Sequence, residues 1–173
     1  YAFSFLEDSQ HRIWGNGFYR LYRLDRSTGE YSYYQPDENN PNSLISSNIR
    51  DMALDKSGNL WVTYYTGGIS RYNQIEDHFE HFFTDSESLI RLQRSIPILA
   101  VQNGQLWVGT GGSGLYLLDP ESETYIEHYD QSPDNSGGLT DNRVYNLHED
   151  RDGNIWAGTG NGLNRITRIQ NDS

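Results

Sequence analysis

The sequence predicts an all-β fold built from four repeated units, and three observations support this prediction. Aromatic residues make up 13% of the 173-residue chain, and aromatic side chains suit the pleated, half-buried surface of a strand. The tryptophans follow one another at intervals of 47, 46 and 49 residues, at Trp14, Trp61, Trp107 and Trp156. Each ends a similar phrase, which small residues and then an aliphatic stretch follow. A repeat of about 40–50 residues made of short strands is typical of a propeller blade.

Each unit shows a similar order of predicted strands. The first strand is an apolar stretch, as at 48–54, 95–101 and 143–147. The second is the tryptophan phrase, and the third is the aliphatic stretch at 21–25, 68–73, 114–119 and 162–166. The fourth holds an aromatic pair, as at 33–34, 81–82 and 128–129. We therefore expect four blades, each a four-stranded antiparallel sheet, at residues 1–38, 44–84, 89–131 and 139–173, with the last incomplete.

Turn and loop residues separate these strands. Gly58 and Gly153 stand where a short hairpin needs positive φ, and the preceding Asp55 and Asp150 can accept hydrogen bonds from the backbone of the same turn. The stretches 36–42 and 132–138 are loops by composition. No window shows a strong helical period, although residues 86–94 are compatible with one or two helical turns.

The number of units predicts an arc of a larger propeller. Four complete blades of this period need about 188 residues, more than the chain has. A compact ring of four blades is the alternative. The chain opens at Tyr1 and shows no leader. We therefore expect it to be a segment cut from a longer protein. An arc leaves two apolar blade faces uncovered, so we expect the remainder of the propeller or a second copy of the chain as a partner.

Composition excludes several classes of protein. The net charge of −11 argues against a nucleic-acid partner, because phosphates are met by clustered Lys and Arg. The chain has no cysteine, which excludes disulfides and thiolate metal sites. The apolar runs are too short to cross a bilayer, so no membrane contact is expected within this segment.

Three motifs resemble nucleotide-binding or metal-binding sites, but they are better explained as parts of the repeat. Residues 109–114 match the pattern Gly-x-Gly-x-x-Gly, but a predicted strand follows them instead of the helix that a dinucleotide site needs. Residues 150–154 resemble the start of a calcium loop without its later Gly and Glu. On a strand, His78 and His81 point to opposite faces and cannot share a metal ion. No catalytic residue, metal or cofactor is predicted.

The repeat resembles the two-component regulator propeller repeat. The matching phrases are 43–49 with 54–62 and 138–144 with 149–159. This resemblance implies an extracytoplasmic, periplasmic sensor region of a bacterial membrane-bound regulator, commonly a hybrid histidine kinase, with a propeller of about seven blades. It also implies that the segment itself is not an enzyme and that a glycan or other small ligand is sensed.

A ligand site is expected on the rim formed by the turns between the second and third strands. Two units keep this turn small, whereas Tyr64 and Tyr65 occupy it in the second unit, and Asn16 and Arg20 in the first. Aromatic rings and a guanidinium suit oligosaccharides. The alternative is that the two tyrosines fill space between blades. Two other functions stay open: a glycan-active propeller lyase or hydrolase, and a protein-docking scaffold.

Overall fold

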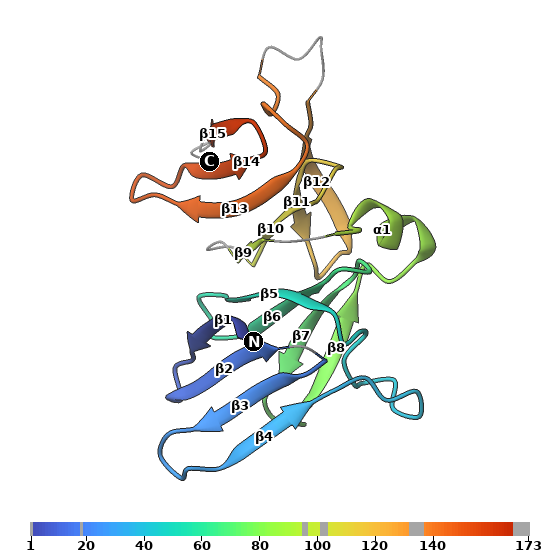
Figure 1. The fold of residues 1–173 in the computed structure, drawn as a ribbon, viewed down its shortest axis with the longest axis vertical. Helices are drawn as coiled ribbons and strands as arrows, with labels where there is room; N and C mark the ends of the chain where they lie inside the picture. The colour runs from blue at the N-terminus through green and yellow to red at the C-terminus, as the bar shows by residue number, and fades with distance from the viewer. Residues whose placement is uncertain (1, 18, 95–96, 101–103, 132–136, 168–173) are drawn as a thin grey trace.

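The strands form four antiparallel sheets that follow one another along the chain. The computed structural model describes residues 2–17, 19–94, 97–100, 104–131 and 137–167. Within each sheet the strands are paired in chain order. Figure 1 shows the sheets in sequence, from β1–β4 to β13–β15; we name them blades 1 to 4. These meanders confirm the predicted all-β fold of propeller blades.

The strand bounds are as follows. Blade 1 contains β1 (Ala2–Glu7), β2 (Arg12–Gly17), β3 (Leu21–Asp25) and β4 (Tyr31–Tyr34). Blade 2 contains β5 (Ile49–Leu54), β6 (Leu60–Tyr64), β7 (Ile69–Asn73) and β8 (His78–Phe82). Blade 3 contains β9 (Ile98–Ala100), β10 (Leu106–Gly109), β11 (Leu115–Asp119) and β12 (Thr124–Tyr129). Blade 4 contains β13 (Val144–Glu149), β14 (Ile155–Thr159) and β15 (Gly162–Ile166).

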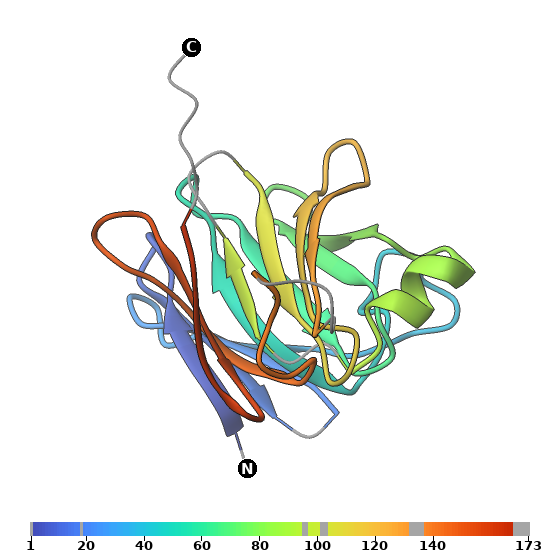
Figure 2. The same cartoon turned by 90° about the horizontal axis from the view of Figure 1, so that it is seen from above.

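Some predicted elements fall partly outside the described residues. These are the start and end of the predicted strand 95–101, most of the loop 132–138, and residues 168–173 at the end of the fourth unit. The helical turns expected at 86–94 are present as α1 (Ser86–Arg91), which Asp85 caps by accepting hydrogen bonds from the backbone of Glu87 and Ser88. Helix α1 lies at the periphery of the sheets (Figure 2). In the described part of the chain, no helix is long and apolar enough to cross a membrane.

The predicted turn chemistry closes the hairpins between the first and second strands. Gly58 and Gly153 have φ of +83° and +79°. Asp55 Oδ1 accepts hydrogen bonds from the backbone N–H of Ser57 and Asn59, both 2.9 Å long. Blade 1 has His11 at the position of these glycines, and His11 takes the same left-handed region with φ of +60°. The hairpin geometry is therefore kept even where its preferred residue is absent.

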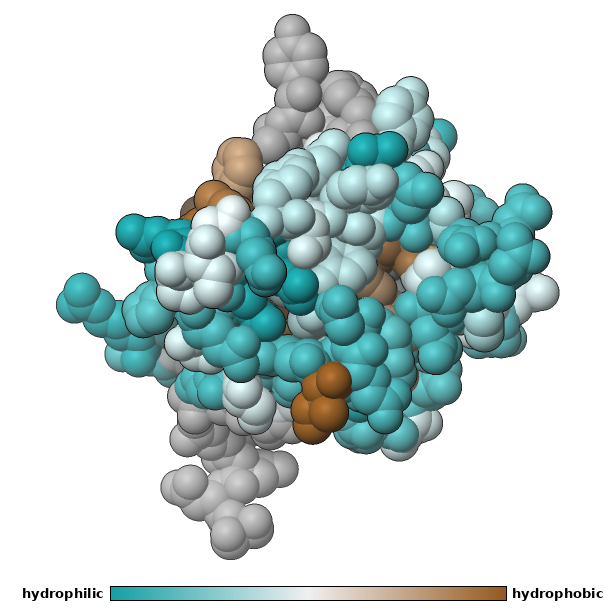
Figure 3. All heavy atoms as spheres, turned by 90° about the horizontal axis from the view of Figure 1, so that it is seen from below, coloured by the Kyte–Doolittle hydropathy of each residue, from teal (hydrophilic) through white to brown (hydrophobic). Residues whose placement is uncertain are grey.

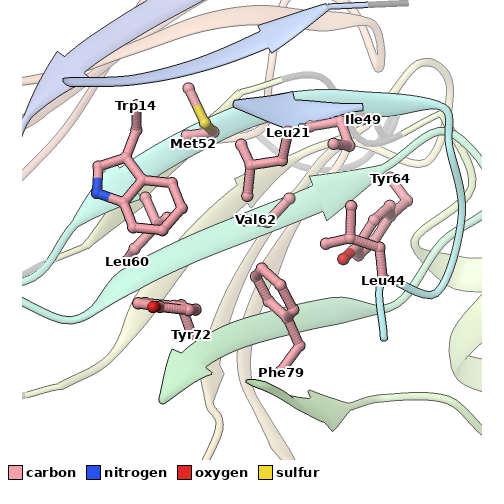
Figure 4. Close-up of a cluster of buried hydrophobic side chains, with 10 residues drawn as sticks. All are labelled: Trp14, Leu21, Leu44, Ile49, Met52, Leu60, Val62, Tyr64, Tyr72 and Phe79. Atoms are coloured by element: carbon pink, nitrogen blue, oxygen red, sulfur yellow. The ribbon is translucent and has the colours of Figure 1, made fainter. Parts of the chain in front are cut away.

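Three apolar clusters hold the blades together, one at each interface between successive blades. Figure 4 shows the cluster between blades 1 and 2, in which Trp14 from blade 1 lies beside Leu60 and Tyr72 of blade 2. Trp61 and Trp107 occupy the equivalent places in the next two clusters, and the three indoles are at most 1% exposed. Because each tryptophan is on the second strand of its blade, the repeat period sets the spacing of the core.

The described blades form an arc. The inner strands β1, β5, β9 and β13 are neighbours in that order along the central channel. In the described part of the chain no apolar cluster joins blade 4 to blade 1, and large side chains on both end blades are exposed, including Phe5 at 70% and Leu163 at 63%. The compact ring of four blades is therefore wrong for this structure. Closing it would bury the apolar faces that stay open here.

Candidate functional site

The inner strands of all four blades line a cavity of about 300 Å³ at one end of the central channel. Its lining residues are Ser4, Arg50, Asp51, Pro97, Ile98, Tyr145, Asn146 and Leu147. They all lie near the beginning of an inner strand or just before it. Because the Asp hairpins follow the ends of these strands, the cavity is at the opposite end of the channel. The cavity combines a guanidinium, a carboxyl, a phenol, an amide and a hydroxyl with the apolar side chains of Pro97, Ile98 and Leu147.

A shared backbone irregularity aims these side chains into the channel. The register of the inner strand shifts just before Ser4 in β1, Asp51 in β5 and Asn146 in β13. An irregularity of this kind inserts a residue into one strand and turns its side chains. The same position in three blades thus supplies a hydroxyl, a carboxyl and an amide to one cavity, while the tryptophan positions stay constant.

Arg50 is the cationic member of the cavity and has no carboxylate partner among the described residues. Its guanidinium carbon lies 4.4 Å from the centre of the Tyr65 ring, a favourable cation–π distance. Its Nε is buried and has no hydrogen-bond partner within the described structure. A buried donor without a partner is costly, and the Arg50 side chain lines the cavity, where the other N–H groups of the guanidinium can meet an acceptor.

A second guanidinium approaches the same ring. The guanidinium carbon of Arg94 lies 5.9 Å from the Tyr65 ring centre, and the Arg94 backbone N–H donates to the Tyr65 carbonyl over 2.9 Å. Gly111 lies beside Arg94, where an added Cβ would be only 2.7 Å from the Arg94 Cβ. The small turn of blade 3 therefore leaves room for Arg94. We name Arg50, Tyr65 and Arg94 the Arg–Tyr–Arg cluster.

Asp51 supplies the carboxyl group of the cavity lining. Its Oδ2 accepts a hydrogen bond from the backbone N–H of Ile98 over 3.1 Å, which ties β5 to β9. Burial raises the pKa of the Asp51 carboxyl, and backbone hydrogen bonds from Ile98 and Met52 oppose this only in part. Asp51 therefore keeps a proton to higher pH than an exposed aspartate.

Tyr64 does not lie on the surface as expected. Its side chain is 0% exposed, its hydroxyl donates to Ser70 Oγ over 2.8 Å, and it packs in the cluster with Leu44 (Figure 4). Tyr64 is the last residue of β6 and its side chain enters the core, whereas Tyr65 is the first residue of the following turn and is half-buried beside Arg50. The prediction of an accessible pair is wrong for Tyr64, and the space-filling alternative describes it.

Asn16 is buried, and Arg20 stacks on a ring of its own blade. Asn16 is 0% exposed, and its Oδ1 accepts hydrogen bonds from the backbone N–H and the hydroxyl of Ser4. Its Nδ2 donates to the Arg50 carbonyl over 3.4 Å. Asn16 therefore connects Ser4 and Arg50, two residues that line the cavity. Arg20 stacks on Tyr33 at 4.1 Å, beside the outermost strand of blade 1. The expectation of an accessible Asn16 is therefore wrong, because its amide satisfies buried polar groups.

Sequence reasoning missed Arg50, Asp51, Arg94 and Tyr145. One signal was present: the beginning of the inner strand differs between units, with Arg50-Asp51 in blade 2 where blade 4 has Tyr145-Asn146. Variation at one position of otherwise similar repeats indicates a surface that packing does not constrain. Among the described residues, no group of three or more His, Cys, Asp or Glu side chains could hold a metal ion.

Comparison with known proteins agrees with this architecture. Residues 43–66 and 138–161 match the family model of the two component regulator propeller. The chain is 28% identical over 134 residues to "Histidine kinase P4" of Formosa agariphila. The aligned region covers 72% of this chain and 9% of that protein.

Solved structures share the fold. The extracellular domain of the putative hybrid two component system BT3049 from B. thetaiotaomicron superposes with a TM-score of 0.80 at 23% identity, over 99% of this chain and 23% of that one. The extracellular domain of the putative one component system BT4673 from the same organism gives 0.75 at 22% identity, over 95% and 23%. The chain thus spans about a quarter of the length of these structures.

Proposed function

Because residues 43–66 and 138–161 are two-component regulator propeller repeats, we propose that this chain is a glycan-sensing propeller segment of a bacterial two-component signalling protein. The similar solved structures are extracellular domains of putative two component and one component systems, and a sequence relative is a histidine kinase. These likenesses support an extracytoplasmic, periplasmic position for the segment. Any kinase activity would belong to other parts of the protein, and the segment itself binds its ligand without turnover.

The observation that supports a ligand site is the Arg–Tyr–Arg cluster beside the channel cavity. Stacking on Tyr65 holds the Arg50 guanidinium in place, and a guanidinium offers a planar fork of N–H donors that matches a carboxylate or sulfate. Tyr145 lines the same cavity and is 50% exposed, so its ring is free to stack on the C–H face of a sugar. Ser4 and Asn146 supply hydroxyl and amide groups for sugar hydroxyls.

The size and charge of the cavity favour one acidic sugar unit of a longer glycan. Its volume of about 300 Å³ is at the lower end of small-molecule sites. Two guanidiniums without described carboxylate partners create a local positive potential in an otherwise acidic chain. We therefore expect uronic or sulfated oligosaccharides to bind more tightly than neutral ones.

Calorimetric titration tests this proposal directly. The probes are a galacturonic acid trisaccharide, a sulfated galactose trisaccharide and neutral galactotriose. We expect an acidic probe to bind the wild-type chain, and Arg50→Ala to weaken that binding about tenfold or more because a charge-assisted hydrogen bond is lost. The matched control is Arg26→Ala, which removes an exposed arginine that pairs with Glu7 on blade 1, away from the cavity.

Three outcomes would contradict the proposal. If none of the three probes binds, the cavity is not a sugar-binding site. Release of shortened fragments, detected by chromatography after incubation, would show turnover and favour a lyase or hydrolase. An equal loss of affinity in Arg50→Ala and Arg26→Ala would show that general charge, and not the Arg–Tyr–Arg cluster, attracts the ligand.

A further inference from the structure

Blade 2 has an aromatic ring at a position where the later blades have glycine. Tyr65 stands four residues after its tryptophan, and Gly111 and Gly160 stand at the same place in blades 3 and 4. The ring lies within cation–π distance of two guanidiniums, with the guanidinium carbons of Arg50 and Arg94 at 4.4 and 5.9 Å from its centre. This departure from the repeat therefore gathers two cations around one turn.

The arginines at one position of the repeat differ in their partners. Arg94 and Arg143 each stand 13 residues before the tryptophan of their blade. Arg143 Nη2 donates to Asp141 Oδ2 over 2.5 Å, so its charge is balanced within its own loop. The residue two before Arg94 is Leu92, which is 0% exposed in the cluster between blades 2 and 3. Arg94 is exposed and has no carboxylate partner among the described residues.

The backbone fixes the place of Arg94 beside the ring. Its N–H donates to the Tyr65 carbonyl over 2.9 Å, and its φ of +56° lies in the left-handed region, which is unfavourable for a residue with a Cβ. Helix α1, just before it, sits tightly on the turn of blade 2, because an added Cβ at Gly67 would lie 2.5 Å from the Leu89 carbonyl oxygen. Strained backbone that the surroundings enforce is frequent at binding sites.

The two guanidiniums occupy different parts of the site. Arg50 lines the channel cavity, whereas Arg94 is not among the residues that line it. Because the guanidinium carbons lie 4.4 and 5.9 Å from the same ring centre, their separation is at most the sum of these distances. Anionic groups on neighbouring units of an oligosaccharide can span such a separation.

The rest of the chain does not favour anions. Polar side chains cover much of the face that Figure 3 shows, and Asp and Glu outnumber Lys and Arg by 24 to 13 in the whole chain. An anionic ligand is therefore repelled by the chain as a whole, and its binding needs cations gathered at one place. The Arg–Tyr–Arg cluster is such a place.

We propose that the Arg–Tyr–Arg cluster binds two anionic groups of one oligosaccharide, the first on Arg50 at the cavity and the second on Arg94 outside it. This inference rests on the proposed glycan site and narrows its ligand to a chain with a carboxylate or sulfate on each of two neighbouring units. Each guanidinium offers a fork of donors to one anion. Once the first anion is bound, the second contact is intramolecular, so the two contacts reinforce each other.

Calorimetric titration with probes that differ only in their number of anionic groups tests the proposal. One set is digalacturonic acid, its monomethyl ester and its dimethyl ester; the other is galactobiose with two, one or no sulfates. In the set that binds, we expect the probe with two anionic groups to bind about tenfold or more tightly than the probe with one. Arg94→Ala should remove most of this difference and change the affinity for the probe with one anionic group by less than about twofold. Arg50→Ala should weaken the binding of both.

A matched control variant separates the position of Arg94 from general charge. Arg91→Ala removes the same charge three residues earlier, from an arginine that pairs with Glu87 on α1 and lies over the Tyr125 ring. It should keep the wild-type preference for two anionic groups. Tyr65→Phe keeps the ring beside both guanidiniums and should keep this preference as well, whereas Tyr65→Leu should reduce it. Circular dichroism checks that each variant is folded.

The outcomes distinguish this inference from the proposed function. If no probe binds, the glycan site and the inference are both wrong. If acidic probes bind and Arg50→Ala weakens them, but probes with one and two anionic groups bind equally well, the glycan site stands and the inference is wrong. The inference is also overturned if Arg94→Ala weakens both probes to the same extent, or if Arg91→Ala has the same effect as Arg94→Ala.

Discussion

The indole N–H of Trp156 donates a hydrogen bond to Asp150 Oδ2 over 2.7 Å. The equivalent bonds in blades 1 and 2 are 2.8 and 2.9 Å long, from Trp14 to Asp8 and from Trp61 to Asp55. The aspartate stands six residues before its tryptophan each time, so one carboxylate closes the hairpin and orients the indole. This hydrogen bond, with those from Asn154, lowers the pKa of Asp150 to about 2.

Blade 3 departs from this arrangement. The residue six before Trp107 is Val101, which lies outside the described residues, and the buried Nε1 of Trp107 has no hydrogen-bond partner in the described structure. Leu117 also replaces the arginine that lies over the indole in the other blades. An unpaired buried N–H costs about 1–3 kcal/mol. The Trp107 indole therefore contributes to the interface with blade 4 through apolar packing, and backbone hydrogen bonds such as that from the Val144 N–H to the Thr110 carbonyl join the same two blades.

Removing Asp8 should destabilise blade 1 strongly. Its carboxylate accepts hydrogen bonds from Arg12 Nε over 2.6 Å and from the Trp14 indole, and Asp8→Ala leaves the buried Arg12 guanidinium without this partner. We expect the free energy of unfolding, measured with urea, to fall by about 3 kcal/mol. Asp152→Ala, at an exposed residue of the blade 4 hairpin, should change it by less than about 0.5 kcal/mol. Similar effects in both variants would contradict a specific role for the carboxylate.

Tryptophans at covered and uncovered faces should differ in their contribution to stability. Trp61 is 1% exposed between blades 2 and 3, and Trp61→Ala should cost about 3–5 kcal/mol. Trp156 is half-buried on the free face of blade 4, so Trp156→Ala should cost roughly half as much. Thermal unfolding of the wild type and of both variants measures these losses. Equal losses would show that the face of Trp156 is covered in solution.

The left-handed backbone at His11 should respond to glycine. His11 has φ of +60°, which disfavours residues with a Cβ, and its exposed ion pair with Glu7 contributes little. We expect His11→Gly to raise the free energy of unfolding by about 1 kcal/mol. The reverse change, Gly153→Ala at φ of +79° with open space around it, should lower it by about 1 kcal/mol. Stabilisation by both variants would contradict the assigned backbone strain.

Two aspartates should change stability with opposite signs. Burial raises the pKa of Asp51 above its ordinary value of 3.8, so wild-type stability decreases as pH rises from 3.8 through the raised folded pKa. The hydrogen bond from Arg143 lowers the pKa of Asp141 to about 2, so that contribution is present above 3.8 and is lost as pH falls towards 2. At neutral pH we therefore expect Asp51→Asn to stabilise the chain and Asp141→Asn to destabilise it.

Urea unfolding of both variants across this pH range checks the assignment. The stabilisation by Asp51→Asn should disappear below pH 3.8, where the wild-type carboxyl is protonated in both states. The loss in Asp141→Asn should disappear as pH approaches 2. If Asp51→Asn destabilises the chain at neutral pH, the hydrogen bond from Ile98 to the charged carboxylate contributes more than its burial costs.

The repeat determined the fold because its signals are local. The spacing of the tryptophans, the Asp and Gly residues of the hairpins and the short aliphatic stretches each act over a few residues, and they recur from blade to blade. A turn that needs positive φ at Gly58 or Gly153 needs it in any surroundings. Strand order, hairpin chemistry and the buried tryptophans of the interfaces could therefore be inferred from the sequence alone.

Only the tertiary structure decided which side chains reach the surface and meet there. Tyr64 and Tyr65 are neighbours in the sequence, yet Tyr64 ends β6 with its side chain in the core, and Tyr65 begins the following turn beside Arg50. Arg50 and Arg94 are far apart in the chain, and they approach one ring because blades 2 and 3 pack face to face and Gly111 leaves space. The exposure of a side chain in a turn, such as Tyr65, depends on the particular residues that pack beside it, and the repeat pattern does not specify those contacts.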